Sequence, residues 1–359
     1  MVANAPNLSE QIDFQIRTSG PMSVATYMGL CLTHPSKGYY RTNDPLGAAG
    51  DFVTAPEISQ MFGELIGFYV AQLFQQMSSP NPVTLLELGP GRGTLMADML
   101  RVLSRLEGFR EALDLCLFET SPALIAEQKA RLAQYDGKWI TDFDQVGTGP
   151  LLVIANEFFD ALPIRQFVKQ ADGWHERVIG LVDGQRRFGL NPTPVPEASI
   201  PEALRGAEIN AVHEVALAGT QIMDRLARTV ARNGGAILAI DYGYGRTQTG
   251  ETLQGVRRHQ YADVLEAPGE TDLSAHVDFE ALSSVAARAG LSVAPLATQG
   301  EFLTRMGIAE RTQALARANP EAAADLEAAR NRLVAPDQMG TLFKVFCAHS
   351  PGLQPPGFA

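Results

Sequence analysis

Apolar side chains recur at helical spacing in some parts of this chain and form short continuous runs in others. The change from one pattern to the other marks the boundaries between its parts. Residues 8–32 and 56–78 carry apolar side chains at helical spacing, as in ISQMFGELIGFYVAQLF. Between them, residues 34–57 are rich in Gly, Pro and Asn. Because Tyr39, Tyr40 and Phe52 give this segment apolar anchors, we expect an ordered lid here rather than a floppy loop.

Short apolar runs begin at residue 83 and alternate with helical patterns. The runs cover 83–88, 113–119 and 151–156, and helical spacing follows the first two at 93–106 and 122–135. Strands buried on both faces read as continuous apolar runs, which is typical of a parallel sheet with helices on each side. The pattern therefore predicts an α/β fold with a helical cover at its N-terminal end.

The alternation breaks after residue 163. Residues 164–190 resemble short strands, with Asp172-Gly173 and Asp183-Gly184 as hairpin signals. A Pro-rich connection leads to a helix over about 207–232, an apolar strand over 235–243, a helix over 277–289, two more helices and a last strand over 341–349. We predict a cover and lid (1–82), an α/β domain (83–348) with a β-rich insertion at about 164–206 and an irregular one at about 242–275, and a tail (349–359).

Composition and charge exclude several function classes. The 359 residues carry a net charge of −11, so no basic surface indicates a nucleic-acid partner. Three scattered cysteines define no disulfide framework, and six histidines without ligand spacing favour no metal site. No run approaches the roughly 18 apolar residues of a membrane span, and the first residues lack a signal or transit pattern. We expect a bacterial-type cytoplasmic protein without membrane insertion.

Three glycines lie close together between the first strand of the sheet and the helix that follows. Gly89, Gly91 and Gly93 form G-x-G-x-G, which is tighter than the dinucleotide fingerprint G-x-G-x-x-G. Glu87 would repel a pyrophosphate but attract the ammonium and sulfonium of S-adenosylmethionine. Glycines let the backbone approach the methionyl part, and the helix N-terminus favours its carboxylate. The alternative is a purely structural turn.

Acidic residues at the ends of the next two strands could complete such a site. Glu119 could accept both ribose hydroxyls, or it could cap the helix that begins near Ser121-Pro122. Asp142 and Phe143 follow a short strand, where a carboxylate and an aromatic face could meet an adenine. Taken alone, this pair would be an ordinary loop.

Five segments carry a family resemblance: LLELGPGRGTLMADMLR, FETSPALIAEQKARL, ANEFFDALPIRQF, GDFVTAPEISQMFGELIG and LSAHVDFEALS. They resemble the family of the mitochondrial complex I assembly-factor arginine methyltransferase and its bacterial relatives, from about residue 12 to 348. The resemblance implies a class I S-adenosylmethionine methyltransferase fold, which is a Rossmann-like parallel sheet with an antiparallel last strand. It also implies a protein substrate, namely an arginine of the 49-kDa-type subunit of respiratory complex I.

The resemblance gives Asn156, Glu157 and Asp160 the catalytic role. A guanidinium arrives charged, and paired carboxylates can hold it in a fork that leaves one nitrogen facing the methyl group. Glu157 and Asp160 would share a side if their segment were helical. The alternative is a strand-to-helix turn with two solvated acids. Further substrate or lid candidates are Asp51, Phe52, Thr54, Asp241, His276 and Asp278, of which Asp241 could instead start a turn and the last two could cap a helix.

Two function classes remain open from the sequence. The first is a protein methyltransferase, and the second is a non-catalytic assembly chaperone that binds a partner subunit. A methyltransferase that acts on a small molecule is a third possibility. The glycines, Glu119 and the acids of NEFFD favour an enzyme, because a chaperone does not need them.

Overall fold

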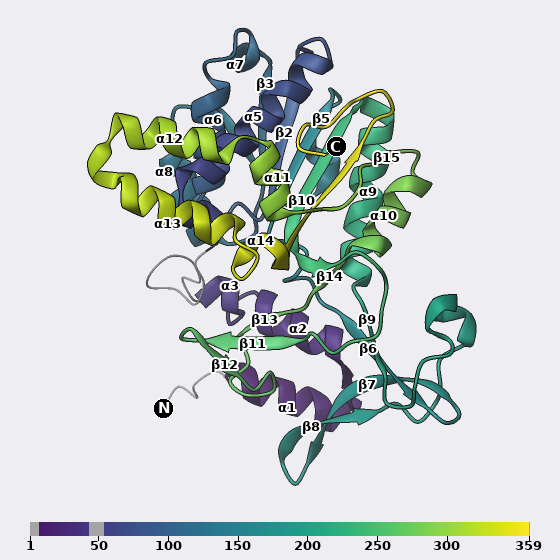
Figure 1. Cartoon of the computed structure of the whole chain (residues 1–359). Helices are drawn as coiled ribbons and strands as arrows, with labels where there is room; N and C mark the ends of the chain where they lie inside the picture. Colours follow the sequence, from purple (N-terminus) through teal and green to yellow (C-terminus); the bar gives the residue numbers. More distant parts are fainter. Residues whose placement is uncertain (1–6, 43–53, 359) are drawn as a thin grey trace. The chain divides into compact units, whose positions relative to one another are not determined.

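The computed structural model describes residues 7–42 and 54–358, and these residues form two compact units. The first unit combines the described residues up to 42 with 160–220 and 246–276. The second combines 54–159, 221–245 and 277–358. Each unit is therefore built from segments that are distant in sequence (Figure 1).

The second unit contains a central sheet whose main strand order is β15-β17-β10-β5-β2-β3-β4. The strands from β10 to β4 are parallel, and β17 runs antiparallel to β10. This arrangement confirms the predicted α/β class with an antiparallel last strand. The strands are β2 (Val83–Leu88), β3 (Leu113–Phe118), β4 (Gly137–Ile140), β5 (Leu151–Asn156), β10 (Gly235–Tyr244), β14 (Val277–Asp278), β15 (Ser292–Val293), β16 (Ala297–Thr298) and β17 (Phe343–His349).

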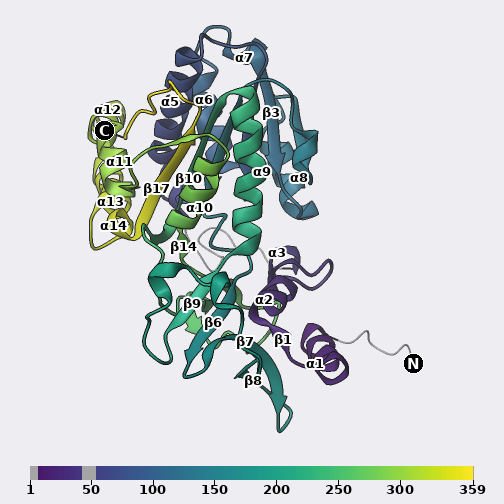
Figure 2. The same ribbon diagram turned by 90° about the vertical axis from the view of Figure 1, so that its right-hand side faces the viewer.

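Helices cover both faces of this sheet (Figures 1 and 2). On one face, α5 and α6 bury Leu85, Leu152 and Leu238 in one apolar core. On the other face, Phe279 of α10 stacks on Phe346 of β17. Burial from both sides explains why these strands read as continuous apolar runs. The helices are α4 (Ala55–Ile58), α5 (Gln60–Gln76), α6 (Thr94–Leu103), α7 (Phe109–Ala112), α8 (Pro122–Arg131), α9 (Leu217–Asn233), α10 (Phe279–Arg288), α11 (Gln299–Arg305), α12 (Ile308–Ala318), α13 (Ala323–Val334) and α14 (Met339–Leu342).

The first unit joins the N-terminal helices to the predicted insertions. Its larger sheet has the order β1-β7-β6-β9 with β8 paired to β7, and its smaller sheet has the order β12-β11-β13. Asp183 and Gly184 both adopt positive φ between β7 and β8, which confirms the predicted hairpin. The elements are α1 (Leu8–Ser19), β1 (Met22–Ser23), α2 (Val24–Thr33), α3 (Tyr39–Thr42), β6 (Arg165–Gln170), β7 (Gly173–Val182), β8 (Gln185–Leu190), β9 (Val212–Val215), β11 (Gln254–Arg257), β12 (Gln260–Ala262) and β13 (Asp272–Ser274).

Several predicted segments differ from the structure. The insertion at about 242–275, which was expected to be irregular, contains the three strands β11, β12 and β13 of the smaller sheet. The helical pattern of 8–32 forms two helices, because Gly20 takes a φ of 87° and Pro21 follows it. The helix expected from 207 begins at Leu217, since 212–215 pair with β6 as a strand. After residue 298 the described chain contains α11 to α14, where two helices were expected.

Within 7–42 and 54–358, no helix has the length and apolarity to cross a membrane. No group of His, Cys, Asp and Glu in these residues could hold a metal ion. Cys31, Cys116 and Cys347 are buried free thiols.

Candidate functional site

The glycine loop between β2 and α6 has a backbone that most residues avoid. Gly89, Gly91 and Gly93 take φ values of 59°, 54° and 76°, all in the left-handed region. A Cβ on Gly89 would lie 3.0 Å from the ring of Phe158. Gly93 is the N-cap of α6 and supplies no side-chain cap. The loop therefore presents bare backbone at the carboxyl end of the sheet, beside a helix N-terminus.

Gln128 of α8 holds this loop in place. Its buried side chain donates from Nε2 to the Gly91 carbonyl (2.6 Å) and to Oε2 of Glu119 (3.2 Å). Its Oε1 accepts from Nε1 of Trp139 at 2.7 Å. Gln128 thus ties the loop to the end of β3. Sequence reasoning missed it, and the one available signal was a glutamine within the LIAEQKARL helix.

Glu87, the acid before the loop, is buried at the end of β2. Its Oε2 has no hydrogen-bond partner among the described residues. Burial, and to a lesser extent repulsion from Glu119, raises the pKa of Glu87 to about 8. A cation placed here would offset both effects. The electrostatics of the site therefore favour a positively charged ligand.

Glu119 lies just beyond β3 and makes local hydrogen bonds. Its Oε1 accepts from the backbone N–H groups of Thr120 (2.7 Å) and Ser121 (2.8 Å). Both N–H groups precede α8, which begins at Pro122, so these bonds order the segment before the helix and do not cap the helix itself. Binding of ribose hydroxyls by Glu119 stays a prediction.

An aromatic platform follows β4. Phe143 stacks on Phe118, with ring centroids 4.6 Å apart, and the Arg225 guanidinium lies 5.4 Å from the Phe143 centroid. Asp142 accepts from the backbone N–H of Asp144 and from Arg225 Nη2 (2.6 Å), and these bonds lower its pKa. Phe143 is thus stacked on Phe118 and also approached by the Arg225 guanidinium. Binding of an adenine by Asp142 and Phe143 stays a prediction.

Glu157 follows β5 in a strained conformation. Its φ is 50°, which is uncommon for a residue with a side chain, and its N–H donates to the Ile240 carbonyl at 2.9 Å. Oε1 accepts from Nδ2 of Asn156 (3.0 Å) and from the Ala55 N–H (3.4 Å). The buried Oδ1 of Asn156 has no hydrogen-bond partner among the described residues. Two acceptor groups therefore meet at the end of β5.

The segment that carries Glu157 and Asp160 is not helical, so the two acids do not share the side of a helix. The residues after β5 form bends and turns until β6 begins at Arg165, so spacing by three does not place the two acids on one helix face. The alternative of two solvated acids also fails, because Asp160 is 8% exposed. Asp160 falls in the first unit, where its carbonyl accepts from the Ala275 N–H.

Asp241 anchors the turn that carries Glu157. This residue of β10 is 1% exposed. Its Oδ2 accepts from the Phe159 N–H and its Oδ1 from the Tyr242 N–H, both at 3.0 Å. The carboxylate therefore fixes the backbone two residues beyond Glu157.

The remaining candidates either make helix-cap or backbone contacts or lie outside the described residues. Asp278 caps α10 by accepting from the Ala281 N–H at 3.0 Å, as the capping alternative predicted. The His276 N–H donates to Oγ1 of Thr252 in the first unit. Thr54 is the N-cap of α4 and makes no side-chain cap bond. Asp51 and Phe52 lie outside the described residues.

The fold and the glycine loop together define a class I methyltransferase. Residues 65–296, more than half of the chain, match a family described as "Putative S-adenosyl-L-methionine-dependent methyltransferase", and the chain belongs to this family.

Proteins named "Protein arginine methyltransferase NDUFAF7, mitochondrial" are similar over nearly the whole chain. The Danio rerio protein is 38% identical over 92% of this chain and 84% of its own length. The human protein is 35% identical over 93% and 81%. These names place the relatives in mitochondria, unlike the cytoplasmic location expected for this chain.

Two crystal structures from Burkholderia thailandensis share the fold. One contains S-adenosyl-homocysteine and superposes with a TM-score of 0.86 at 27% identity, covering 98% of this chain and 93% of the other. The second has a TM-score of 0.83 at 28% identity, with coverage of 98% and 94%. The protein is an S-adenosylmethionine-dependent methyltransferase.

Proposed function

We propose that this enzyme methylates arginine side chains of a protein substrate. The observation that carries the proposal is the pair of acceptors at the end of β5. There the Glu157 carboxylate lies beside the Oδ1 of Asn156, which has no hydrogen-bond partner within residues 7–42 and 54–358. The relatives named protein arginine methyltransferases support it at the level of the whole chain.

A site that binds a guanidinium must supply a negative charge and hydrogen-bond acceptors in a fixed orientation. It is protonated at any physiological pH, and its five N–H donors match a carboxylate in a fork. Glu157 would hold it by charge-assisted hydrogen bonds, and Asn156 Oδ1 would accept a further N–H. The strained backbone of Glu157 aims its side chain at the cost of local stability, as residues at functional sites often do. Asp160 is retained as a substrate-binding candidate on the family resemblance alone.

The cofactor-binding role belongs to the residues around the glycine loop. Gly89, Gly91 and Gly93 would pass close to the methionyl part, Glu87 would face its positive charge, and Glu119 would accept the ribose hydroxyls. Asp142 and Phe143 would meet the adenine. When bound, S-adenosylmethionine supplies a methyl group on a positively charged sulfur. The chain's own residues position the acceptor nitrogen and balance the charge.

The substrate that we propose is the 49-kDa-type subunit of respiratory complex I. This assignment rests on the family resemblance of the five segments and on the family's role in complex I assembly. A non-catalytic chaperone would bind the same subunit without methylating it, and a small-molecule methyltransferase would ignore it.

The test compares that subunit from cells with and without this protein. We expect peptide mass spectrometry to find one methylated arginine that is absent from the deletion strain and restored by the wild-type gene. A subunit with identical masses in both strains would contradict the proposed function. Normal complex I assembly together with an unmethylated subunit in cells that contain the protein would favour the chaperone.

A further inference from the structure

The strand β8 is an edge of the larger sheet in the first unit. Among the described residues it pairs with β7 alone, from Val182↔Gln185 to Arg177↔Leu190. None of its six residues is buried. The outer edge of such a strand offers backbone N–H and C=O groups to any extended segment that lies beside it.

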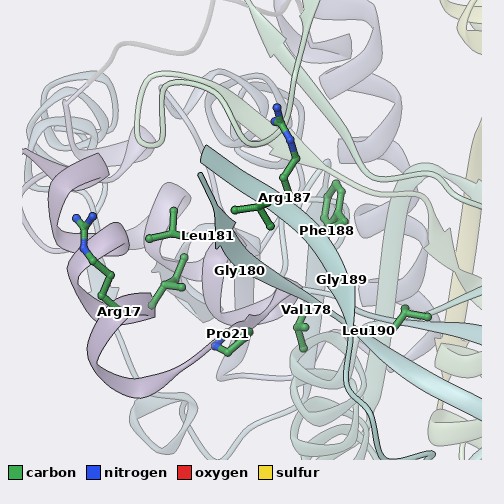
Figure 3. Close-up of a pocket in the computed structure, with 11 residues that line it drawn as sticks. Arg17, Pro21, Val178, Gly180, Leu181, Arg187, Phe188, Gly189 and Leu190 are labelled. Atoms are coloured by element: carbon green, nitrogen blue, oxygen red, sulfur yellow. The ribbon is translucent and has the colours of Figure 1, made fainter. Parts of the chain in front are cut away.

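A groove of about 410 Å³ lies between α1 and the β7–β8 hairpin. Figure 3 shows Gly180 of β7 and Gly189 of β8 among the residues that line it. A Cβ on Gly189 would meet nothing within 4 Å, and one on Gly180 would meet Pro21 alone. Because glycine has no side chain, the surface has a hollow at these two positions. Phe188 and Leu190 add exposed apolar area, with 38% and 39% of their surfaces accessible.

The groove is basic in an acidic protein. Arg17 and Arg187 line it, and none of its lining residues is Asp or Glu. Neither arginine forms an ion pair with a carboxylate of the described residues, and Arg187 donates to the neutral Gln185 side chain and Arg186 carbonyl. Other arginines of this sheet are paired: Arg165 with Glu176, Arg177 with Glu251 and Arg186 with Asp13. The two positive charges are therefore available to an outside anion, although the chain has 40 acidic residues against 29 basic ones.

We propose that this groove binds an acidic segment of the protein substrate, an inference that rests on the proposed function. One apolar side chain of this segment fills the hollow over Gly180 and Gly189, and neighbouring carboxylates reach Arg17 and Arg187. The alternative explanation is that the charged arginines only prevent other chains from pairing with the exposed edge of β8 and aggregating.

The first test uses a fluorescent eight-residue peptide in which two central Val residues are flanked on each side by three Glu residues, and the same peptide with Lys in place of Glu is its charge control. We expect the Glu peptide to bind in an anisotropy titration, with an affinity that falls as salt rises, and the Lys peptide not to bind. The double variant R17E/R187E should weaken binding about tenfold or more. Equal binding of the two peptides, or no binding of either, would overturn the proposal.

A second variant tests the hollow without changing any charge. Gly189→Val fits a strand and meets open space, so the fold should be retained while the hollow is filled, and peptide binding should fall about tenfold. Arg205→Glu and Gly206→Val are the matched controls, because both residues are exposed in the same unit outside the groove. Binding unchanged in Gly189→Val would overturn the proposed groove. So would a dimer of the wild type that both groove variants abolish, since the occupant would then be a second copy.

The same variants separate this proposal from the proposed function. Methylation of the complex I subunit by the wild type tests the function alone. If the wild type methylates it and the groove variants do so at the same rate, the function stands and the groove proposal fails. Slower methylation with normal S-adenosylmethionine binding in the groove variants supports both.

Discussion

Glu87 is the residue whose ionisation the fold alters most at the site. Its pKa of about 8 lies far above its ordinary value of 4.5, because burial disfavours the charged carboxylate. Between these values the folded state keeps a proton that the unfolded state has lost. The free energy of unfolding therefore falls as pH rises through this window, by up to about 1.4 kcal/mol per pH unit from this group. Under the proposed function, the positive charge of the bound cofactor would favour the ionised carboxylate and offset this loss.

We predict that binding of S-adenosylmethionine releases a proton from Glu87. A cationic ligand favours the ionised carboxylate, so the affinity should rise with pH up to about 8 and then level off. Titration calorimetry at pH 7 in two buffers with different ionisation enthalpies measures the released proton. Glu87→Gln is the control, because the amine of the ligand titrates in both proteins while the amide side chain of the variant cannot ionise. The same proton release in both proteins would contradict this role.

The individual residues of the site were only partly predictable. The three glycines could be recognised from the sequence, because closely spaced glycines indicate a backbone with positive φ. The structure shows positive φ at each of them. Gln128 is visible in the sequence only as a glutamine within a predicted helix, and Phe118 only as an apolar residue of a predicted strand, since their partners Gly91 and Phe143 are distant in sequence. Strain at Glu157 depends on the Ile240 carbonyl from another strand, which no pattern around residue 157 reveals.

At the scale of elements, the turn after β5 depends on its neighbour β10. We predict that Asp241→Asn destabilises the protein by about 1–3 kcal/mol, because an amide accepts only one of the two backbone N–H groups that the carboxylate now accepts. Methyl transfer should fall with it, since Asp241 positions the backbone of the Glu157 turn. Urea unfolding gives the free energy, and an assay with saturating cofactor gives the rate.

Asp278→Asn is the matched control for this change. Asp278 is an N-cap, and asparagine caps a helix about as well as aspartate, so its free energy of unfolding should change little. Equal stability of the two variants would show that Asp241 does not anchor the turn.

Elements with continuous or periodic burial were the predictable ones. The runs predicted at 83–88 and 151–156 match β2 and β5, because burial on both faces leaves an unbroken apolar signal. The strand β9 was hidden inside a predicted helix, since its four residues are too short to show a period and depend on pairing with β6. Spacing alone allowed a helix after residue 156, whereas the bonds of this segment to β10 hold it as a turn.

At the scale of the whole molecule, the first unit shows what sequence patterns miss. The predicted cover and the two predicted insertions share one apolar core, which includes Ile12, Tyr27, Ile179 and Leu273. Met22 pairs with Ile179, and the Tyr27 hydroxyl donates to the Val264 carbonyl. These contacts join residues that are far apart in the chain, and such pairing leaves no local periodicity. By contrast, α5 packs with α6 in the second unit, although the prediction grouped it with the cover.

The central claim is that the chain is a catalyst, with cofactor sites and substrate sites on different residues. Glu157 separates these roles, because the proposed function assigns it to the guanidinium and assigns the cofactor to the glycine loop. Glu157→Gln keeps the shape of the side chain and removes its charge. It also keeps an oxygen that can accept from Asn156 and Ala55.

The most direct test measures two quantities on purified wild type and Glu157→Gln: binding of S-adenosylmethionine by calorimetry, and methyl transfer to the 49-kDa-type subunit by mass spectrometry. We predict that the variant binds the cofactor within a few-fold of the wild type while its turnover falls by about 10²–10⁴. Loss of cofactor binding and turnover together would mean that the segment is structural. Full turnover in the variant would contradict the account.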